Sequence, residues 1–161
     1  ACALRLEQTG HIVAAGGNGQ VFGYRLRDTD GWQTIAATPP QGTRFKGYEK
    51  TVALGAIGDS AVIDFCGLGA QALAYVPTLA NDWKEFLPSD LHAHRTQILN
   101  ARSGMVDLKN ILGRDCSPMV NLAILDQAAE IGLIGRGVFK VPAQLFADPS
   151  EVTLRYSCAE P

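Results

Sequence analysis

Apolar and polar side chains alternate along the first third of the chain. The pattern is clearest in QVFGYRLR, residues 20–27, and it recurs in CALRLE, residues 2–7. In the clearer segment one face takes Phe22, Tyr24 and Leu26, and the other takes Val21, Gly23, Arg25 and Arg27. A period of two with one polar face is typical of a half-buried antiparallel strand. WQTIAAT, residues 32–38, is a third predicted strand.

Turn-forming residues separate these strands. AAGGNGQ, residues 14–20, is predicted to be a glycine-rich turn, because its Asn18-Gly19 pair is a strong hairpin signal. PPQGTRFKGYEK, residues 39–50, is predicted to be a loop, since prolines and glycines punctuate it. The opening of the chain is therefore predicted to form an antiparallel β-meander.

The alternation stops at Ser60. The run of small and aliphatic residues from there to Tyr75 predicts a tightly packed central helix that begins within two or three residues of Ser60 and is ended or kinked by Pro77. Gly67 and Gly69 lie inside this run, although a glycine in a helix interior costs about 1 kcal/mol relative to alanine. We expect another element to pack closely against these glycines; the alternative is that a ligand does.

Shorter elements follow the central helix. TLANDWKEFL, residues 78–87, predicts an amphipathic helix, and RTQILNARSG, residues 95–104, is expected to hold another short element. The apolar side of the first of these helices takes Leu79, Trp83, Phe86 and Leu87. Strands are predicted in residues 117–125 and 136–142, and a turn of helix in residues 143–150. Strands that come before helices predict an α+β fold: a β-meander, then a glycine-rich central helix and further strands, in one domain over residues 1–161.

Composition and charge narrow the class of protein. The chain is 47% hydrophobic and 19% charged, as ordinary globular proteins are. A net charge of -2 and a pI of about 5.9 argue against a nucleic-acid-binding protein, which would carry a basic face. No apolar run reaches the roughly 18 residues that a membrane-spanning helix needs. We therefore expect neither nucleic acid nor a membrane as a partner.

The four cysteines are far apart and form no C-x-x-C pair. They are Cys2, Cys66, Cys116 and Cys158. This spacing does not resemble a secreted disulfide scaffold, so we expect a reducing cytoplasm; a bridge between Cys2 and Cys158 is the less favoured alternative. A buried, unreactive thiol is preferred over a nucleophile for Cys116 in RDCSP, because no histidine stands in a telling sequence context.

The pair Asp59-Ser60 precedes the predicted central helix. One interpretation is an N-terminal cap, in which a side-chain oxygen accepts a hydrogen bond from the first turn. The other is an anion site, in which Gly55 and Gly58 let a carboxylate or phosphate approach the backbone N–H groups. From the residues alone we favour the cap.

Two other groups of residues are candidates for binding. Gly132, Gly135 and Gly137 do not form the dinucleotide fingerprint, but they are able to line a site as a backbone loop, and Arg136 among them suits an anionic group. His92 and His94 in DLHAHR fit two ligands on one strand face, yet a metal site needs a third ligand, so we expect solvated surface residues. We predict no metal, and the sequence names no cofactor.

Several segments in a fixed order carry a resemblance to a known family. They are NGQVFGYRL, GWQTIAATPPQGTRFKGY, IGDSAVIDFCGLGAQALAYVP and VNLAI with IGLIGRGVFKVPAQLF. Together they resemble the C-terminal part of the YlbE-like proteins (domain of unknown function 1116), over about residues 10–149. The family is much longer and includes a subunit of oxamate carbamoyltransferase, which transfers a carbamoyl group from oxalurate to phosphate. The N-terminal half of the family is absent from this sequence.

The resemblance implies a site for a small anionic metabolite. It raises the anion interpretation of Gly58, Asp59 and Ser60 to equal weight with the cap. It also adds Asn121 to the candidate ligand-binding residues, beside Gly132, Gly135, Arg136 and Gly137.

Some positions depart from the family pattern. Leu122-Ala123, Asp126-Gln127 and Leu133 stand where the family carries polar residues. The resemblance therefore implies a fold that is kept while an activity is changed or lost.

Three functions follow from these patterns. The first is a subunit or domain of a carbamoyl- or amide-handling enzyme of nitrogen catabolism, which binds a small anion near the Gly-Asp-Ser segment. The second is a non-catalytic structural or assembly module. The third and weakest is a cysteine-dependent amidohydrolase that uses Cys116 or Cys66. We expect a homo-oligomer or a partner subunit in each case, since two tryptophans and the absent half suggest exposed apolar surface.

Overall fold

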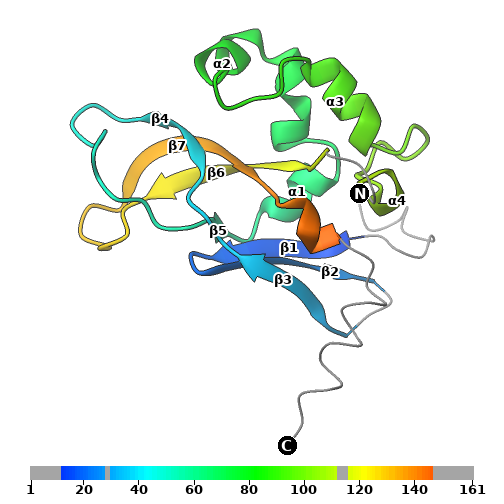
Figure 1. Ribbon diagram of the computed structural model, residues 1–161, viewed down its shortest axis with the longest axis horizontal. Helices are drawn as coiled ribbons and strands as arrows, with labels where there is room; N and C mark the ends of the chain where they lie inside the picture. The colour runs from blue at the N-terminus through cyan, green and yellow to red at the C-terminus, as the bar shows by residue number, and fades with distance from the viewer. Residues whose placement is uncertain (1–11, 28–29, 112–115, 147–161) are drawn as a thin grey trace, which may run out of the picture.

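Two small antiparallel sheets and a layer of short helices build the molecule (Figure 1). The computed structural model describes residues 12–27, 30–111 and 116–146. The first sheet has the order β3-β2-β1-β5, with β1 Ile12–Asn18, β2 Val21–Leu26, β3 Trp32–Ala36 and β5 Ile57–Gly58. The second has the order β4-β7-β6, with β4 Gln41–Arg44, β6 Met119–Leu125 and β7 Leu133–Lys140. The predicted α+β class is confirmed.

The predicted β-meander is formed by β1, β2 and β3. Its first hairpin turns at Asn18-Gly19, where the Asn18 side chain accepts hydrogen bonds from the N–H groups of Gln20 at 3.0 Å and Val21 at 2.8 Å. Gly19 has a positive φ of 87°, which glycine adopts without strain. On β2 the predicted apolar face is confirmed, since Phe22, Tyr24 and Leu26 are all buried. The predicted strand at residues 2–7 lies outside the described residues.

Two assignments in this region are wrong. The predicted turn over residues 14–20 is mostly strand, because β1 runs through Gly16 and Gly17 to Asn18. The predicted loop over residues 39–50 contains β4, which pairs with β7. β1 extends to Asn18 because it pairs with β2 of its own hairpin up to the turn. β4 is created by a partner distant in sequence, which local turn propensity does not register.

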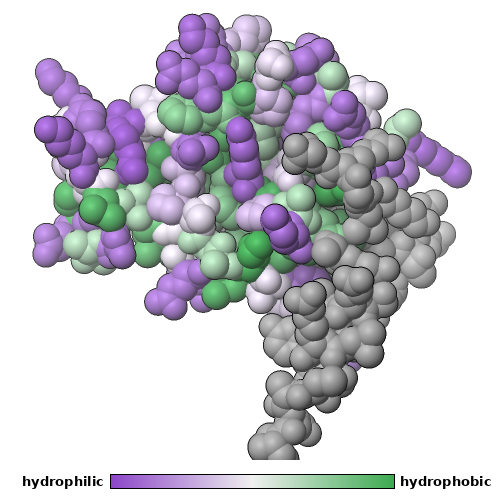
Figure 2. Space-filling model, viewed as in Figure 1, coloured by the Kyte–Doolittle hydropathy of each residue, from purple (hydrophilic) through white to green (hydrophobic). Residues whose placement is uncertain are grey.

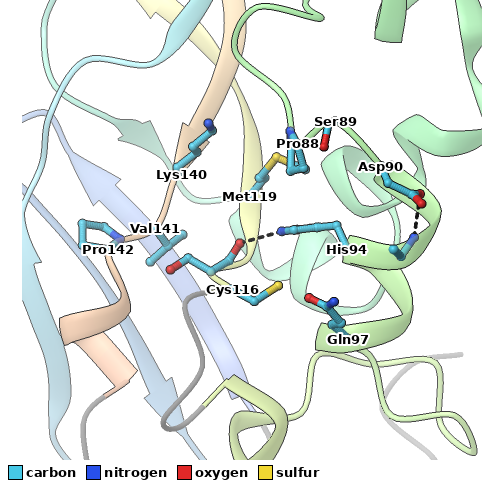
Figure 3. Close-up of a pocket in the computed structure, with 12 residues that line it drawn as sticks. Pro88, Ser89, Asp90, His94, Gln97, Cys116, Met119, Lys140, Val141 and Pro142 are labelled. Atoms are coloured by element: carbon cyan, nitrogen blue, oxygen red, sulfur yellow. Dashed lines mark hydrogen bonds between the residues drawn. The ribbon is translucent and has the colours of Figure 1, made fainter.

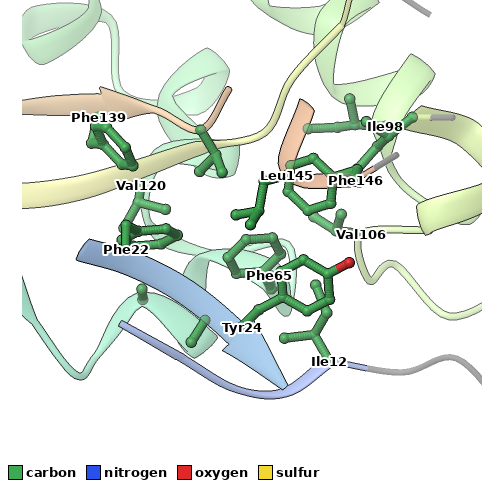
Figure 4. Close-up of a cluster of buried hydrophobic side chains, with 14 of the residues drawn as sticks. Ile12, Phe22, Tyr24, Phe65, Ile98, Val106, Val120, Phe139, Leu145 and Phe146 are labelled. Atoms are coloured by element: carbon green, nitrogen blue, oxygen red, sulfur yellow. The ribbon is translucent and has the colours of Figure 1, made fainter. Parts of the chain in front are cut away.

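The main core lies between the two sheets and is rich in aromatic side chains (Figure 4). Phe22 of β2 meets Phe139 of β7 with ring centroids 4.9 Å apart, and Tyr24 stacks on Phe146 at 5.3 Å. Phe65 packs against Phe146 from the helical side. These contacts join both sheets and one helix into a single apolar cluster.

Short helices complete the fold. They are α1 Ala61–Phe65, the 3₁₀-helix η2 Gly69–Tyr75, α2 Pro77–Asp82, α3 Leu91–Ile98, α4 Leu108–Ile111 and the 3₁₀-helix η3 Ala143–Phe146. The start of the central helix at Ala61 confirms the prediction. The helix predicted over residues 78–87 is confirmed only in its first half, because α2 ends at Asp82. Trp83 and Leu87 follow its end and are buried against β6 and β7. In the described ranges no helix is both long and apolar enough to cross a membrane.

The predicted continuous helix from residue 60 to residue 75 is wrong. It is divided at Gly67 (φ 78°) and Gly69 (φ 53°), both in the left-handed region that favours glycine. A Cβ at Gly67 would overlap the Gly104 carbonyl oxygen, and one at Gly69 would overlap the Asp64 carboxylate. Close packing, and not a crossing ligand, therefore accounts for the two glycines.

The buried Asp64 carboxylate holds the two halves of this segment together. Its Oδ1 accepts hydrogen bonds from the N–H of Ala70 at 2.7 Å and from the N–H of Asn121 at 3.0 Å. Arg95 of α3 adds a second connection, because its Nη1 donates to the carbonyl oxygens of Gly67 and Gln71 at 2.7 Å each. Asp64 thus connects α1, η2 and β6, and Arg95 attaches α3 to the same place.

We expect Asp64 to make stability depend on pH. Burial raises its pKa from 3.8 to about 6, although the hydrogen bonds from Ala70 and Asn121 oppose the shift. The folded state therefore holds the proton more tightly than the unfolded state does. The stabilisation is complete below about pH 4 and is lost as pH rises through about 6, with a change of about 3 kcal/mol.

Urea unfolding of Asp64→Asn and Asp64→Ala at pH 4.5 and 7 tests this expectation. Asp64→Asn keeps an acceptor and should remove most of the pH dependence. Asp64→Ala should cost about 1–3 kcal/mol for each N–H left without a partner. An unchanged pH dependence in Asp64→Asn would contradict the assignment.

Candidate functional site

A hollow lined by main chain lies on the first sheet, beside the predicted Gly-Asp-Ser segment. Its volume is about 610 Å³. Gly58 and Asp59 line it together with side chains and main chain of three strands, including Gly16, Gly17, Asn18, Trp32 and Thr34. We call this the glycine hollow. Its lining residues come from positions 13–34 and 58–62, which the fold brings together.

Glycines form the walls of this hollow because the backbones approach closely there. A Cβ at Gly16 would overlap the Gly58 carbonyl oxygen, and one at Gly17 would overlap that of Ala56. Gly58 itself has a φ of 136°, which side-chain-bearing residues rarely adopt, although its nearest atom, Cδ2 of Leu122, is 3.5 Å away. Close packing of β1 against the β5 segment therefore explains Gly16 and Gly17, whereas the φ of Gly58 explains that glycine.

The interpretation of Ser60 as a side-chain cap, favoured from the residues alone, is wrong. Ser60 is at the N-cap position but has helical angles, φ −81° and ψ −1°, and its side chain makes no capping hydrogen bond. A residue whose side chain caps a helix normally has extended backbone angles, and the angles of Ser60 are not extended. Asp59 and Ser60 are both exposed, and Asp59 lines the glycine hollow.

The remaining predicted residues lie on the second sheet, apart from the glycine hollow. Asn121 of β6 and Arg136 of β7 are exposed, whereas Gly135 and Gly137 are buried where β4 crosses close to β7. Gly132 has a φ of 84° in the β6–β7 connection. Asn121 is linked to the helix that follows the Gly-Asp-Ser segment, because its N–H donates to Asp64 of α1.

A second pocket lies between α3 and the end of β7, with a volume of about 520 Å³ (Figure 3). Asp90, His94 and Gln97 of the α3 region face Cys116 and Lys140 across it. Sequence reasoning did not associate these residues, because they come from three separate segments. We call it the α3 pocket.

The two histidines lie on a helix, so their assignment to one strand face is wrong. His92 is exposed and meets Tyr75 edge-on, with ring centroids 5.4 Å apart. His94 is only partly exposed, and its Nε2 donates a hydrogen bond to the Ser117 carbonyl oxygen at 3.0 Å, since a carbonyl can only accept. The expectation of two solvated surface residues is thus correct for His92 only. In the described segments no three His, Cys, Asp or Glu side chains gather as metal ligands.

Burial determines the charge state of His94. It lowers the pKa of His94 below its usual value, and the positive charge of Lys140 lowers it further, while the bond to Ser117 opposes both. The ring is therefore neutral at pH 7, with its proton on Nε2 and a lone pair on Nδ1. Cys116 is buried in the main core and lines the same pocket, so a neutral imidazole and a thiol both line the α3 pocket.

Comparison with known proteins finds a family model and two curated relatives. The model of the oxamate carbamoyltransferase subunit AllG matches residues 1–60. The chain is 26% identical over 159 residues to oxamate carbamoyltransferase subunit AllG of Escherichia coli (strain K12), which covers 87% of this chain and 38% of that protein. It is 25% identical to the uncharacterized protein YahG of the same organism, over 88% of this chain and 34% of that protein.

A solved structure has a similar fold. It is a conserved protein of unknown function from Enterococcus faecalis V583, with a TM-score of 0.70 and 23% identity over 91% of this chain and 39% of that chain. The chain spans well under half the length of all these proteins. The similarity agrees with the carbamoyltransferase part of the family resemblance, while the YlbE-like name stays a prediction.

Substitutions at Ser60 and Gly58 separate capping from backbone strain. Ser60→Ala should change the free energy of unfolding by less than about 0.5 kcal/mol, because an exposed hydroxyl without a capping bond is removed. Gly58→Val should destabilise by more than about 1 kcal/mol, because valine is strained at this φ. Gly31→Val is the matched control, since Gly31 has open space and no positive φ. Urea unfolding measures the free energy of unfolding of all three variants. A large loss of stability in Ser60→Ala would show that the Ser60 side chain does cap the helix.

Proposed function

We propose that this chain is part of a carbamoyl- or amide-handling enzyme of nitrogen catabolism, of the purine or allantoin type, and that a small anionic substrate binds in its glycine hollow. The chain would act as one domain or subunit of a larger assembly, because its relatives are more than twice as long. Its location in the cytoplasm stays a prediction.

One observation carries this proposal. The part of the chain that matches the AllG model, residues 1–60, contains almost every residue that lines the glycine hollow. Two groups of its lining residues, Gly16-Gly17-Asn18 and Gly58-Asp59, come from opposite ends of the described part of that match. A site built from the matched segment is the first place to look for a shared substrate.

The chemistry of the hollow suits an amide. Oxamate, which gives the similar protein its name, carries a carboxylate and a primary amide. The exposed Asp59 carboxylate accepts hydrogen bonds from amide N–H groups and repels the carboxylate of the same ligand. The ligand would therefore turn its amide toward Asp59 and its carboxylate away from it, toward the glycine walls, where main-chain donors can be approached closely. Asn121 and Arg136, exposed on the second sheet, are further candidate contacts for the same class of ligand.

The second candidate function is a non-catalytic structural module. It is favoured by the positions that depart from the family pattern, since two of them serve the fold. Leu122 is buried in the main core. Asp126 is buried in the β6–β7 connection and accepts hydrogen bonds from three backbone N–H groups, those of Ala128, Glu130 and Ile131.

Calorimetric titration with oxamate separates the two functions. Wild-type protein should bind oxamate, and Asp59→Ala should weaken the affinity about tenfold, because a charge-assisted hydrogen bond is lost. Asp30→Ala, at another exposed aspartate, is the control and should bind as wild type does. Absence of binding heat in the wild-type chain would exclude the ligand site and leave the structural module.

Exposed apolar side chains support association with a partner. Figure 2 shows hydrophobic side chains that interrupt the hydrophilic surface on one face. The large exposed ones include Trp32 at 51%, Leu68 at 54% and Tyr75 at 65% exposure. We expect sedimentation to show self-association, or a complex with a partner subunit. A single species of 17.2 kDa at high concentration would contradict self-association.

A further inference from the structure

A third hollow lies where β4 runs beside the end of β7, with a volume of about 650 Å³. Its lining includes Arg44 and Lys140, together with Thr38, Gln41 and Gly42 from the segment that leads to Arg44. We call it the arginine hollow. It is separate from the glycine hollow, and it neighbours the α3 pocket because Lys140 lines both.

Arg44 has an unsatisfied donor. Its Nη1 is shielded from solvent and has no hydrogen-bond partner. Burying a charged donor without a partner is costly, since the lost hydration is not replaced. A guanidinium group presents its N–H groups in a planar fork that matches a carboxylate or a phosphate. An oxyanion in the hollow would satisfy this nitrogen once the guanidinium turns toward it, since the nitrogen is shielded from solvent in the unliganded chain.

The charge around Arg44 favours an anion as well. The described lining of the arginine hollow holds two cationic side chains, Arg44 and Lys140, and no Asp or Glu. The glycine hollow is the opposite case, because the described residues that line it include Asp59 and no Lys or Arg. Between these two hollows, the arginine hollow is the one in which a negative charge finds attraction without repulsion.

From these observations we propose that the arginine hollow binds a small oxyanion, a carboxylate or a phosphate, held by Arg44 and Lys140. The Arg44 fork contacts two oxygens of the anion, and Lys140 contributes a second positive charge. The Thr38 hydroxyl and the Gln41 amide, on the same wall, supply neutral polar groups. The site does not depend on the function proposed for the glycine hollow.

Calorimetric titration of the full chain with inorganic phosphate and, separately, with oxalate tests the site. Wild-type protein should bind at least one of the two, and the one it binds identifies the oxyanion as a phosphate or a carboxylate. Arg44→Met should weaken that binding about ten- to hundredfold, because a charged hydrogen-bonding partner is removed. The affinity of Arg44→Lys should fall between those of wild type and Arg44→Met, since lysine keeps the charge and loses the planar fork. Lys140→Met should also weaken binding.

Arg102→Met is the matched control, because Arg102 is exposed and distant in sequence from the lining. It should bind as wild type does. Phosphate carries no amide N–H for Asp59 to accept, so phosphate binding reports on the arginine hollow alone, and failure of this site and failure of the glycine hollow are distinguishable. Urea unfolding without ligand should show Arg44→Met no less stable than wild type, because an unsatisfied buried donor is gone. Binding of neither anion by wild-type protein, or equal affinity in Arg44→Met, would overturn the proposal. If Arg44→Met fails to fold, Arg44→Lys carries the same comparison.

Discussion

The arrangement of helices over the second sheet depends on one buried carboxylate. Asp64 sits at the end of α1, and its Oδ1 receives the N–H groups that begin η2 and lie in β6. Because the chain turns sharply at Gly67 and Gly69, no helical hydrogen-bond ladder runs through this point, and Asp64 replaces it. Arg95 then binds the carbonyl groups on the far side of the same turn. This pair of side chains orients η2 and α3, and through α3 it positions the wall of the α3 pocket.

A second constraint is the close approach of main chains in both sheets. Gly16 and Gly17 allow β5 to pair with β1, and Gly42 and Gly137 allow β4 to approach β7. A methyl group at any of these positions would overlap a carbonyl group or backbone atom of the facing strand. The glycine hollow and the arginine hollow both lie beside such places. Packing therefore explains the glycines fully, and a ligand role has to be argued from the polar side chains nearby.

Local pattern predicted only part of this structure. The buried face of β2, the turn at Asn18 and the start of α1 at Ala61 each depend on neighbours within a few residues, and each was predictable. The strand β4 was missed because its pairing partner lies about ninety residues away in β7. The α3 pocket was missed for the same reason, since its residues are distant in sequence. His94, Cys116 and Lys140 belong to separate segments, and only the fold brings them into one pocket. Arg44 carried no sequence signal at all, because its unsatisfied nitrogen is a property of the folded surroundings.

The distribution of charge divides the candidate chemistry between the two sheets. The first sheet presents Asp59, an acceptor suited to the N–H groups of an amide, while the second presents Arg44 and Lys140, donors suited to an oxyanion. Under the proposed function, the transfer of a carbamoyl group to an anion would need both kinds of contact near the reacting atoms. In this chain they line different hollows, and no described pocket contains both Asp59 and Arg44. A complete reacting centre would therefore need additional groups from outside these hollows. The much greater length of the similar proteins fits that requirement, because there this fold accounts for only 34–39% of the chain.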